Sequence, residues 1–436
     1  MSVCTVVELG GIPRAQNSFQ VFNEVESGVR SYCRRFPAVF STARNAVLED
    51  ENGRMYIDFL AAAGSLNYGH NNPEVRDRLI EYLSSDGIIQ ALDLHTLAKR
   101  DFLHEFKRVI LTPRGYDYRL QFTGPTGTNA VEAALKLARK ITGRRNVVAF
   151  TNAFHGMSLA SLAASARASK RAAAGVSLHD VVRMPYDGFL GKDIDSLDVI
   201  EALLLRSGSG IDLPAAFIVE TVQSEGGINV ASSSWLARLA ELAKKHDIVL
   251  IVDDIQAGCG RTGAFFSFER AGIYPDIVCL SKSISGYGLP MSLVLMKPGL
   301  DRWEPGEHNG TFRGNNLAFV AATAVLKYWE DHKFCNAIEY RSRLMAEALH
   351  SMQASAPEHI SEVRGIGMLQ GLVFQDRNVA DRVSQAAFEK GLIVELCGPD
   401  ENVVKLIPPL TIEEDVLLDG LERLSAAVDA QFGYRP

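Results

Sequence analysis

The 436-residue sequence lacks several features that would each indicate a particular class of protein. It contains no run of five or more basic residues and carries a formal net charge of −7, so nucleic acid is not an expected partner. No apolar run reaches the length of about 18 residues that a membrane-spanning helix needs, so a membrane is not expected either. Its six cysteines include no CxxC pair, which indicates neither a disulfide framework nor a zinc site, and no metal is predicted.

The first residues also lack the basic start and the apolar core of a signal peptide. We therefore expect a cytoplasmic protein with reduced thiols, and an N-terminal extension over residues 1–18. No internal repeat or low-complexity segment interrupts the chain. The length predicts two or three domains, and the content of 47% apolar and 22% charged residues is typical of a globular protein with a large core.

Short apolar runs alternate with helical patterns through the middle of the chain. We predict buried strands over Asn146–Phe150, Ala215–Glu220, Ile248–Asp253, Ile277–Leu280 and Leu293–Met296. Apolar residues at helical spacing predict helices over Asn129–Ile141 and Ser233–His246. This alternation predicts an α/β domain whose mostly parallel sheet is covered on both faces.

The two ends of the chain have a different pattern. Val47–Leu60 predicts a hairpin around Asn52 and Gly53, and the chain is rich in helical patterns from about residue 318. Strands are expected over Gly365–Phe374 and Gly391–Leu406. We therefore expect a smaller α+β domain built from residues 19–65 and 321–436, beside a large domain formed by residues 66–320.

A glycine- and threonine-rich loop, Thr123–Asn129, precedes a predicted helix. Glycines let a backbone approach an anion, threonines offer hydroxyl groups, and a helix N-terminus adds free N–H groups and a positive dipole end. The loop is therefore a candidate phosphate site. Taken alone, the loop slightly favours a plain helix cap by Thr126 or Thr128, because such caps are common.

Two predicted strands end in charged residues. Asp253 and Asp254 close one of them, where an α/β sheet places its ligands, and a protonated pyridine nitrogen is one partner that would stabilise a carboxylate there. A salt bridge to Arg261 or a helix cap would also explain it. Lys282 closes the other strand and is either a surface charge or a desolvated amine able to form a Schiff base.

Together, the strings DDIQAGCGRTG and SKSISGYG resemble the class-III (ω) aminotransferases, a branch of the fold-type I enzymes that use pyridoxal 5'-phosphate (PLP). The resemblance covers about residues 20–430. It implies an α/β fold with a large, mostly parallel domain and a smaller α+β domain built from both chain ends. It also implies amino-acid and keto-acid substrates, PLP as the cofactor, and a homodimer or higher homo-oligomer with shared active sites.

The resemblance assigns a role to individual residues. Lys282 matches the Schiff-base lysine, which also moves a proton, and Asp253 matches the partner of the pyridinium nitrogen. Gln256 matches the residue that hydrogen-bonds the ring hydroxyl. Phe154 matches the aromatic residue on one face of the ring, and Ile255 packs on the other.

The phosphate ligands follow from the same match. Gly127 and Thr128 match the phosphate loop, and Thr311 matches a ligand that the family takes from the neighbouring subunit. His155 lies beside the stacking residue Phe154, and we interpret it as a packing or hydrogen-bonding residue of the cofactor site.

Three positions differ from the ornithine, acetylornithine and 4-aminobutyrate branches. Those branches carry an arginine at position 157, but a thioether such as Met157 cannot form a bidentate pair with a substrate carboxylate. Ser224 replaces the usual glycine beside Glu225, which matches the family's gate glutamate. In those branches the gate glutamate pairs with an arginine, and the corresponding residue here is Lys405. Lysine keeps the positive charge but lacks the forked geometry of a guanidinium group. An unrelated strand lysine is the alternative for Lys405.

These departures, together with the strings LNYGHNNP, GPTGTN, FHGM, SKSISGYGLP and WEPGEHNGTFRGNN, resemble the L-2,4-diaminobutyrate:2-oxoglutarate aminotransferases. Members of that branch serve ectoine, siderophore or antibiotic biosynthesis. The resemblance implies that L-aspartate 4-semialdehyde and L-glutamate are converted to L-2,4-diaminobutyrate and 2-oxoglutarate in a ping-pong cycle through Lys282. Alternatives are an ornithine- or 4-aminobutyrate-type enzyme, a PLP aminomutase or racemase, and a non-catalytic protein that kept the fold.

Overall fold

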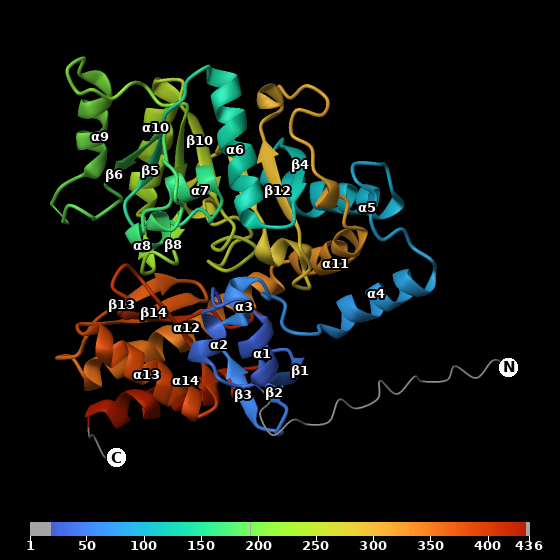
Figure 1. Cartoon of the computed structure of the whole chain (residues 1–436), viewed down its shortest axis with the longest axis vertical. Coiled ribbons are helices and arrows are strands. Elements are labelled where there is room, and N and C mark those ends of the chain that lie inside the picture. The colour runs from blue at the N-terminus through green and yellow to red at the C-terminus, as the bar shows by residue number, and fades with distance from the viewer. Residues whose placement is uncertain (1–18, 192, 433–436) are drawn as a thin grey trace.

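A central seven-stranded sheet organises one half of the molecule in the computed structural model, which describes residues 19–191 and 193–432 (Figure 1). The strand order is β4-β12-β11-β10-β7-β5-β6. Strands β11, β10, β7, β5 and β6 pair in parallel, whereas β12 is antiparallel to both β11 and β4. The strands are β4 (Arg119–Gly124), β5 (Val147–Phe150), β6 (Val181–Met184), β7 (Ala216–Val219), β10 (Val249–Asp253), β11 (Ile277–Leu280) and β12 (Ser292–Met296).

Helices cover both faces of this sheet. Every residue of β5, β7, β10, β11 and β12 is buried. Ile251 belongs to the apolar cluster that includes α6 (Gly127–Thr142), whereas Leu250 belongs to the cluster that includes α10 (Ser233–Lys245). Alternate residues of one strand therefore pack against different helices, which explains why these strands are continuous apolar runs.

The other half of the molecule combines elements from the N-terminal part of the chain, blue in Figure 1, with elements from its C-terminal part, orange to red. One sheet has the order β1-β2-β3-β15, in which β15 (Leu392–Ile393) pairs in parallel with β3 (Met55–Asp58). A second sheet has the order β13-β14-β17-β16 and is antiparallel throughout. Its strands are β13 (Ile360–Ile366), β14 (Leu369–Phe374), β16 (Glu395–Cys397) and β17 (Val403–Leu406).

The remaining elements complete these layers. The strands are β1 (Phe40–Arg44), β2 (Val47–Asp50), β8 (Val222–Gln223) and β9 (Asn229–Val230). The helices are α1 (Gln20–Val25), α2 (Tyr32–Arg35), α4 (Pro73–Ser84), α5 (Leu97–Glu105), α7 (Leu159–Ala164), α8 (Ala168–Ala172), α9 (Ser196–Leu205), α11 (Asn316–Leu326), α12 (Lys333–Ser355), α13 (Arg377–Glu389) and α14 (Glu414–Phe432). None of the helices in the described residues combines the length and the apolar character that crossing a bilayer requires.

The predicted α/β fold is confirmed, and the five strands predicted in the middle of the chain are shifted by no more than a residue or two at their ends. The expected strands over Gly391–Leu406 are present as β15, β16 and β17, with residues 398–402 outside any strand. The expected strand over Gly365–Phe374 is wrong, because a turn at Gly367 and Met368 divides it between β13 and β14. Gly367 has a φ of +62°, and an added Cβ atom would meet the backbone of Thr262, so only glycine fits this turn. The predicted N-terminal extension lies outside the described residues.

A buried arginine ties the central sheet to the C-terminal part of the chain. Arg261, in the loop after β10, is fully buried and donates to the carbonyl oxygens of Met368 at 3.0 Å and Pro408 at 2.6 Å. It also donates to Oδ1 of Asn67 at 2.5 Å. The predicted alternative of an Asp253–Arg261 salt bridge is therefore wrong. Burial lowers the pKa of Arg261 to about 9, opposed by Asp58.

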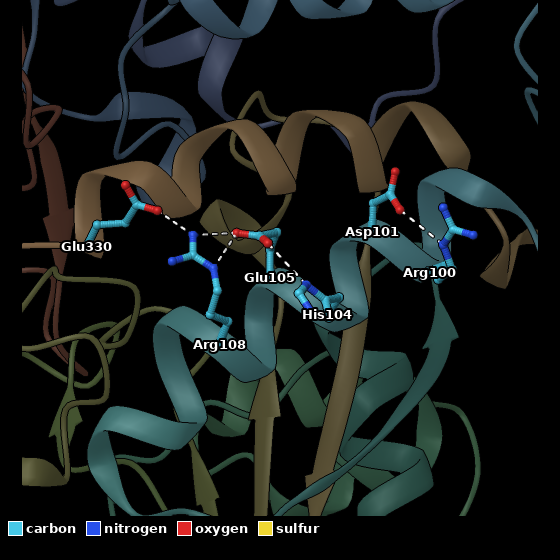
Figure 2. Close-up of polar contacts among 6 residues, drawn as sticks. All are labelled: Arg100, Asp101, His104, Glu105, Arg108 and Glu330. Atoms are coloured by element: carbon cyan, nitrogen blue, oxygen red, sulfur yellow. Dashed lines mark hydrogen bonds and ion pairs between the residues drawn. The ribbon is translucent and has the colours of Figure 1, made fainter.

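Unlike the buried Arg261, Arg108 lies at the surface, where it forms exposed ion pairs (Figure 2). Arg108 bridges Glu105 and Glu330 beyond the end of α5, and His104 contacts Glu105. The side chain of Arg108 is half exposed. Exposed ion pairs of this kind contribute little to stability, because water and salt screen them.

We predict that Arg261→Met lowers the free energy of unfolding by about 3 kcal/mol or more, because it leaves several buried oxygen atoms without a donor. Urea unfolding followed by tryptophan fluorescence measures the change. Arg108→Met is the matched control and should leave the unfolding midpoint unchanged. Equal midpoints for the two variants would contradict the role of Arg261.

Candidate active site

The carboxyl ends of β10 and β11 bring the central charged residues together. Lys282 follows β11 with a φ of +52°, a left-handed conformation that is uncommon outside glycine and typical of strained functional positions. Its Nζ atom donates to the carbonyl oxygen of Ala63 at 2.9 Å. Lys282 keeps some open surface, yet the surrounding protein lowers its pKa to about 8 by burial, so the alternative of a surface charge is wrong.

The acceptor for Lys282 is presented by a left-handed turn. Ala61, Ala62 and Ala63 have φ values of +46°, +49° and +57°, and Gly64 follows at +78°. Each alanine in this conformation costs about 1–2 kcal/mol, so the surrounding structure must hold the turn in place. The carbonyl oxygen of Gly64 accepts from the hydroxyl of Ser283 at 2.8 Å, which joins the turn to the residue after Lys282.

Asp253 is held by a buried histidine. Its Oδ2 atom lies 2.7 Å from Nδ1 of His155, and its Oδ1 atom accepts from the backbone N–H of Ile255 at 3.2 Å. Both side chains are almost fully buried. The Nε2 atom of His155 has no hydrogen-bond partner among the described residues. His155 therefore orients the carboxylate, which agrees with its interpretation as a hydrogen-bonding residue.

Asp254 points to a different environment from Asp253. It accepts hydrogen bonds from the backbone N–H and the hydroxyl of Ser267. Burial raises its pKa to about 7, although the bonds from Ser267 oppose the shift. Asp254 is thus a structural carboxyl group that holds the loop after β10.

Glu225 and Lys405 form an ion pair, as the gate assignment requires. Their Oε1 and Nζ atoms are 2.5 Å apart, and the side chain of Lys405 is fully buried on β17. Burial opposes ionisation of Glu225, but the charges of Lys405 and Lys282 and hydrogen bonds from Lys405 and Gln256 together lower its pKa. The Nε2 atom of Gln256 also donates to Ala63 at 2.9 Å, on the carbonyl oxygen that Lys282 uses.

Lys405 has a second carboxylate partner that the sequence did not reveal. Oε2 of Glu395 lies 2.9 Å from its Nζ atom, and Oε1 of Glu395 accepts from the hydroxyl of Tyr32 at 2.7 Å. Glu395 lies directly opposite Lys405 in the β16–β17 register. Burial lowers the pKa of Lys405, but Glu225 and Glu395 outweigh it and raise that pKa above its ordinary value.

The candidate phosphate loop begins α6. Thr126 caps this helix reciprocally with Asn129, so the predicted cap is present. At the start of any α-helix the first backbone N–H groups have no partner within the helix, so those of α6 can bind a phosphate. A Cβ atom on Gly127 would lie 2.9 Å from Cδ1 of Ile255, so only glycine keeps this approach open. The Thr128 hydroxyl lies 2.5 Å from that of Ser158.

Phe154, Met157 and Thr311 make fewer contacts with the other predicted site residues. The backbone N–H of Phe154 donates to the carboxyl group of Glu220, which is buried. Burial and the nearby charge of Asp253 both raise the pKa of Glu220. Met157 is half exposed. Thr311 is exposed in a 3-10 turn, and no hydrogen bond or ion pair joins it to the other predicted residues in the described ranges.

These residues fit the phosphate, ring and aldehyde of PLP. Gly127 and the N-terminus of α6 offer an open cradle for an anion, and Asp253 offers a buried, oriented carboxylate. Lys282 offers an amine with a lowered pKa on the adjacent strand end. No group of three or more His, Cys, Asp or Glu side chains in residues 19–191 and 193–432 is arranged to hold a metal ion.

Comparison with known proteins gives consistent results. The family described as aminotransferase class-III matches residues 30–428. A diaminobutyrate–2-oxoglutarate transaminase from Bordetella parapertussis is 55% identical over 94% of each chain, and one from Nocardia farcinica is 54% identical over 94% of each. The ornithine aminotransferase of Toxoplasma gondii, in a structure with partial occupancy of PLP at its active site, has a TM-score of 0.81 at 27% identity, covering 95% of this chain and 93% of that one.

We predict that Asp254→Asn changes how stability depends on pH. The folded state holds the Asp254 proton up to a pKa of about 7, above the ordinary value of 3.8, so this group loses stabilisation as pH rises between those values. The difference in stability between wild type and Asp254→Asn should therefore shift against wild type over that window. Thermal unfolding at several pH values checks this, and a constant difference would contradict it.

Proposed function

Because the chain belongs to the class-III aminotransferase family, we propose that it converts L-aspartate 4-semialdehyde and L-glutamate to L-2,4-diaminobutyrate and 2-oxoglutarate, with PLP as its cofactor. The observation that carries the proposal is the identity of 54–55% to two proteins named for this reaction, over 94% of the chain. The loss of a carboxylate-binding arginine at Met157 supports it, because 4-aminobutyrate and ornithine enzymes carry arginine at this position.

When bound, PLP supplies an aldehyde that carries the amino group and a ring that takes up the electron pair released at the substrate carbon. Lys282 holds the cofactor through its amine, and its lowered pKa makes the neutral, nucleophilic amine available near neutral pH. Nζ of Lys282, when it is not bonded to the cofactor, would remove the proton from the reacting carbon. Asp253 keeps the ring nitrogen protonated, and His155 fixes the orientation of that carboxylate.

The site must accept two different substrates in turn. Glutamate reacts at its α-carbon and places a carboxylate at the far end, whereas diaminobutyrate reacts at its terminal carbon and places an amino-acid group there. Glu225 lies on a loop with glycines at 226 and 227, and its side chain is 28% exposed, so it is the partner of Lys405 that can move. Glu225 is therefore the substrate gate.

The phosphate site requires a second copy of the chain. Thr311 is exposed and is supplied to the neighbouring subunit, which makes a homodimer with shared active sites the functional unit. Support comes from large apolar side chains that are exposed on α4, at the start of α5 and on the segment that joins them, namely Ile80, Leu83, Ile88, Ile89, Leu92, Leu94 and Leu97. Residues 19–65 and 321–436 form the small domain, and residues 66–320 form the large one.

A panel of amino donors with 2-oxoglutarate tests the reaction. We expect kcat/KM for L-2,4-diaminobutyrate to exceed the values for ornithine and 4-aminobutyrate by at least about tenfold, a preference worth about 1.4 kcal/mol. Aspartate semialdehyde should be formed in step with glutamate. Turnover of diaminobutyrate without 2-oxoglutarate would instead indicate an isomerase and overturn the proposal.

The pKa of Lys282 yields a second prediction. The rate at which the cofactor-free protein binds PLP should rise with pH to about 8 and then level off, whereas an ordinary lysine would continue to about 10.5. Glu225→Gln should shift this midpoint to lower pH, because the charge of Glu225 raises the pKa of Lys282.

Absorbance of the bound cofactor follows this reaction, and borohydride should then fix the cofactor on Lys282. Lys282→Ala is the control, and it should remain colourless and inactive. A midpoint near that of free lysine, or a shift to higher pH in Glu225→Gln, would contradict the assignment.

A further inference from the structure

A short loop after β5, residues 154–158, contacts the candidate cofactor site at two separate places. At one of them, Nδ1 of His155 lies 2.7 Å from Oδ2 of Asp253, the proposed partner of the ring nitrogen. At the other, Oγ of Ser158 lies 2.5 Å from Oγ1 of Thr128, in the candidate phosphate loop. The loop therefore connects the ring end of the proposed site with its phosphate end.

The hydroxyl groups at the phosphate end form a chain of hydrogen bonds with a single direction. The hydroxyl of Ser158 donates to Oε1 of Glu132 at 2.9 Å, and the hydroxyl of Ser161 donates to the carbonyl oxygen of Ser158 at 2.9 Å. A hydroxyl group carries one hydrogen, so both serines use theirs in these bonds. The hydroxyl of Thr128 lies within hydrogen-bond distance of both serines and is therefore the donor to them. With this hydrogen engaged, Thr128 offers a phosphate only its backbone N–H.

Glu132 is the acceptor at the end of this chain. It lies on the second turn of α6, the helix that begins at the candidate phosphate cradle. Besides the Ser158 hydroxyl, its Oε1 atom accepts from the backbone N–H groups of Ala160 at 2.9 Å and Ser161 at 3.0 Å, at the start of α7. One carboxylate thus joins α6 to the loop and to the helix that follows it.

A carboxylate this close to the start of α6 is unfavourable for an anion site. Its negative charge opposes the positive end of the helix dipole and repels a phosphate group. Glu132 therefore does not serve anion binding directly. Its hydrogen bonds to residues 158–161 indicate instead that it holds the loop against α6.

Close packing adds to these hydrogen bonds. Gly156 has a φ of +130°, and an added Cβ atom would lie 2.5 Å from Oγ1 and 2.8 Å from Cβ of Thr128. Because the Cβ atom of Thr128 is fixed by the helix backbone, it cannot give way. Only glycine at this position lets the loop approach α6 so closely.

We propose that Glu132 is a positioning residue, which acts through Ser158 and Thr128 to hold residues 154–158 at a fixed distance from the phosphate cradle. Covalent bonds join the ring and the phosphate of PLP, so the loop and α6 must present their contacts at matching positions. A loop that is already held in place contributes to affinity, because less ordering is needed on binding. Inorganic phosphate occupies the cradle alone and does not need this match.

The two ligands separate the effect of Glu132 on the loop from any effect on the cradle. In cofactor-free protein, we expect Glu132→Ala to raise the Kd for PLP by about tenfold or more, because it removes charge-assisted hydrogen bonds that hold the loop. The Kd for inorganic phosphate, measured by its competition with PLP, should stay unchanged or fall, since a repelling charge is lost. Circular dichroism of the bound cofactor, which reports how rigidly the ring is held, should weaken.

Two variants of Thr128 test the direction of the hydroxyl chain. Thr128→Val removes the hydroxyl at nearly constant size, and it should raise the Kd for PLP by about fivefold without changing that for phosphate. Thr128→Ser keeps the hydroxyl and should preserve both the affinity for PLP and the circular dichroism. A Thr128→Val variant that weakens both ligands equally would make the hydroxyl a direct phosphate ligand and overturn the chain. This pair decides the matter if Glu132→Ala does not fold.

Asp376→Ala is the matched control, since the carboxylate of Asp376 likewise accepts from a backbone N–H at the start of a helix, that of Asn378 in α13 at 2.8 Å. It should lower the unfolding midpoint and change neither Kd. An equal rise in both Kd values for Glu132→Ala, or an unchanged Kd for PLP, would overturn the positioning role. Because only cofactor and phosphate are bound, the result does not depend on which amine the enzyme takes.

Discussion

The proposed chemistry depends on two lysines, Lys282 and Lys405, that influence each other electrostatically and are held in opposite states. Burial disfavours the charged form of both. Lys282 forms no ion pair with the described residues, and burial lowers its pKa to about 8. Lys405 contacts two carboxylates, and its pKa rises instead. One lysine is therefore prepared to react and the other to remain a fixed cation.

The fold produces this difference by collecting segments that are distant in the chain. The reactive lysine and Asp253 come from neighbouring strands of the central sheet, where parallel strand ends meet. The fixed lysine and Glu395 come from paired strands near the C-terminus, and Tyr32 comes from a helix near the N-terminus. Arg261 joins the central sheet to the C-terminal part of the chain through buried hydrogen bonds, so the packing that stabilises the fold also helps to position Lys282 and Lys405 relative to each other.

The sequence predicted the part of the site that lies on regular elements. Buried strands alternate with helices, and a charge at a strand end made Asp253 and Lys282 candidates, whereas the resemblance to the class-III aminotransferases gave them their roles. Ala63 could not be found, because it acts through a carbonyl oxygen that any residue possesses, and a run of alanines normally predicts a right-handed helix. Glu395 lies in an apolar strand pattern, and its importance depends on a cross-strand partner that only the register reveals.

The structure also gives a physical reason for lysine at position 405 in place of the arginine of related branches. An ammonium group is a compact charge with three donors, and it can meet two carboxylates that approach from different elements. A guanidinium fork is planar and prefers one carboxylate in a bidentate pair. A lysine shared by a fixed and a movable carboxylate therefore stays paired with Glu395 when Glu225 moves away.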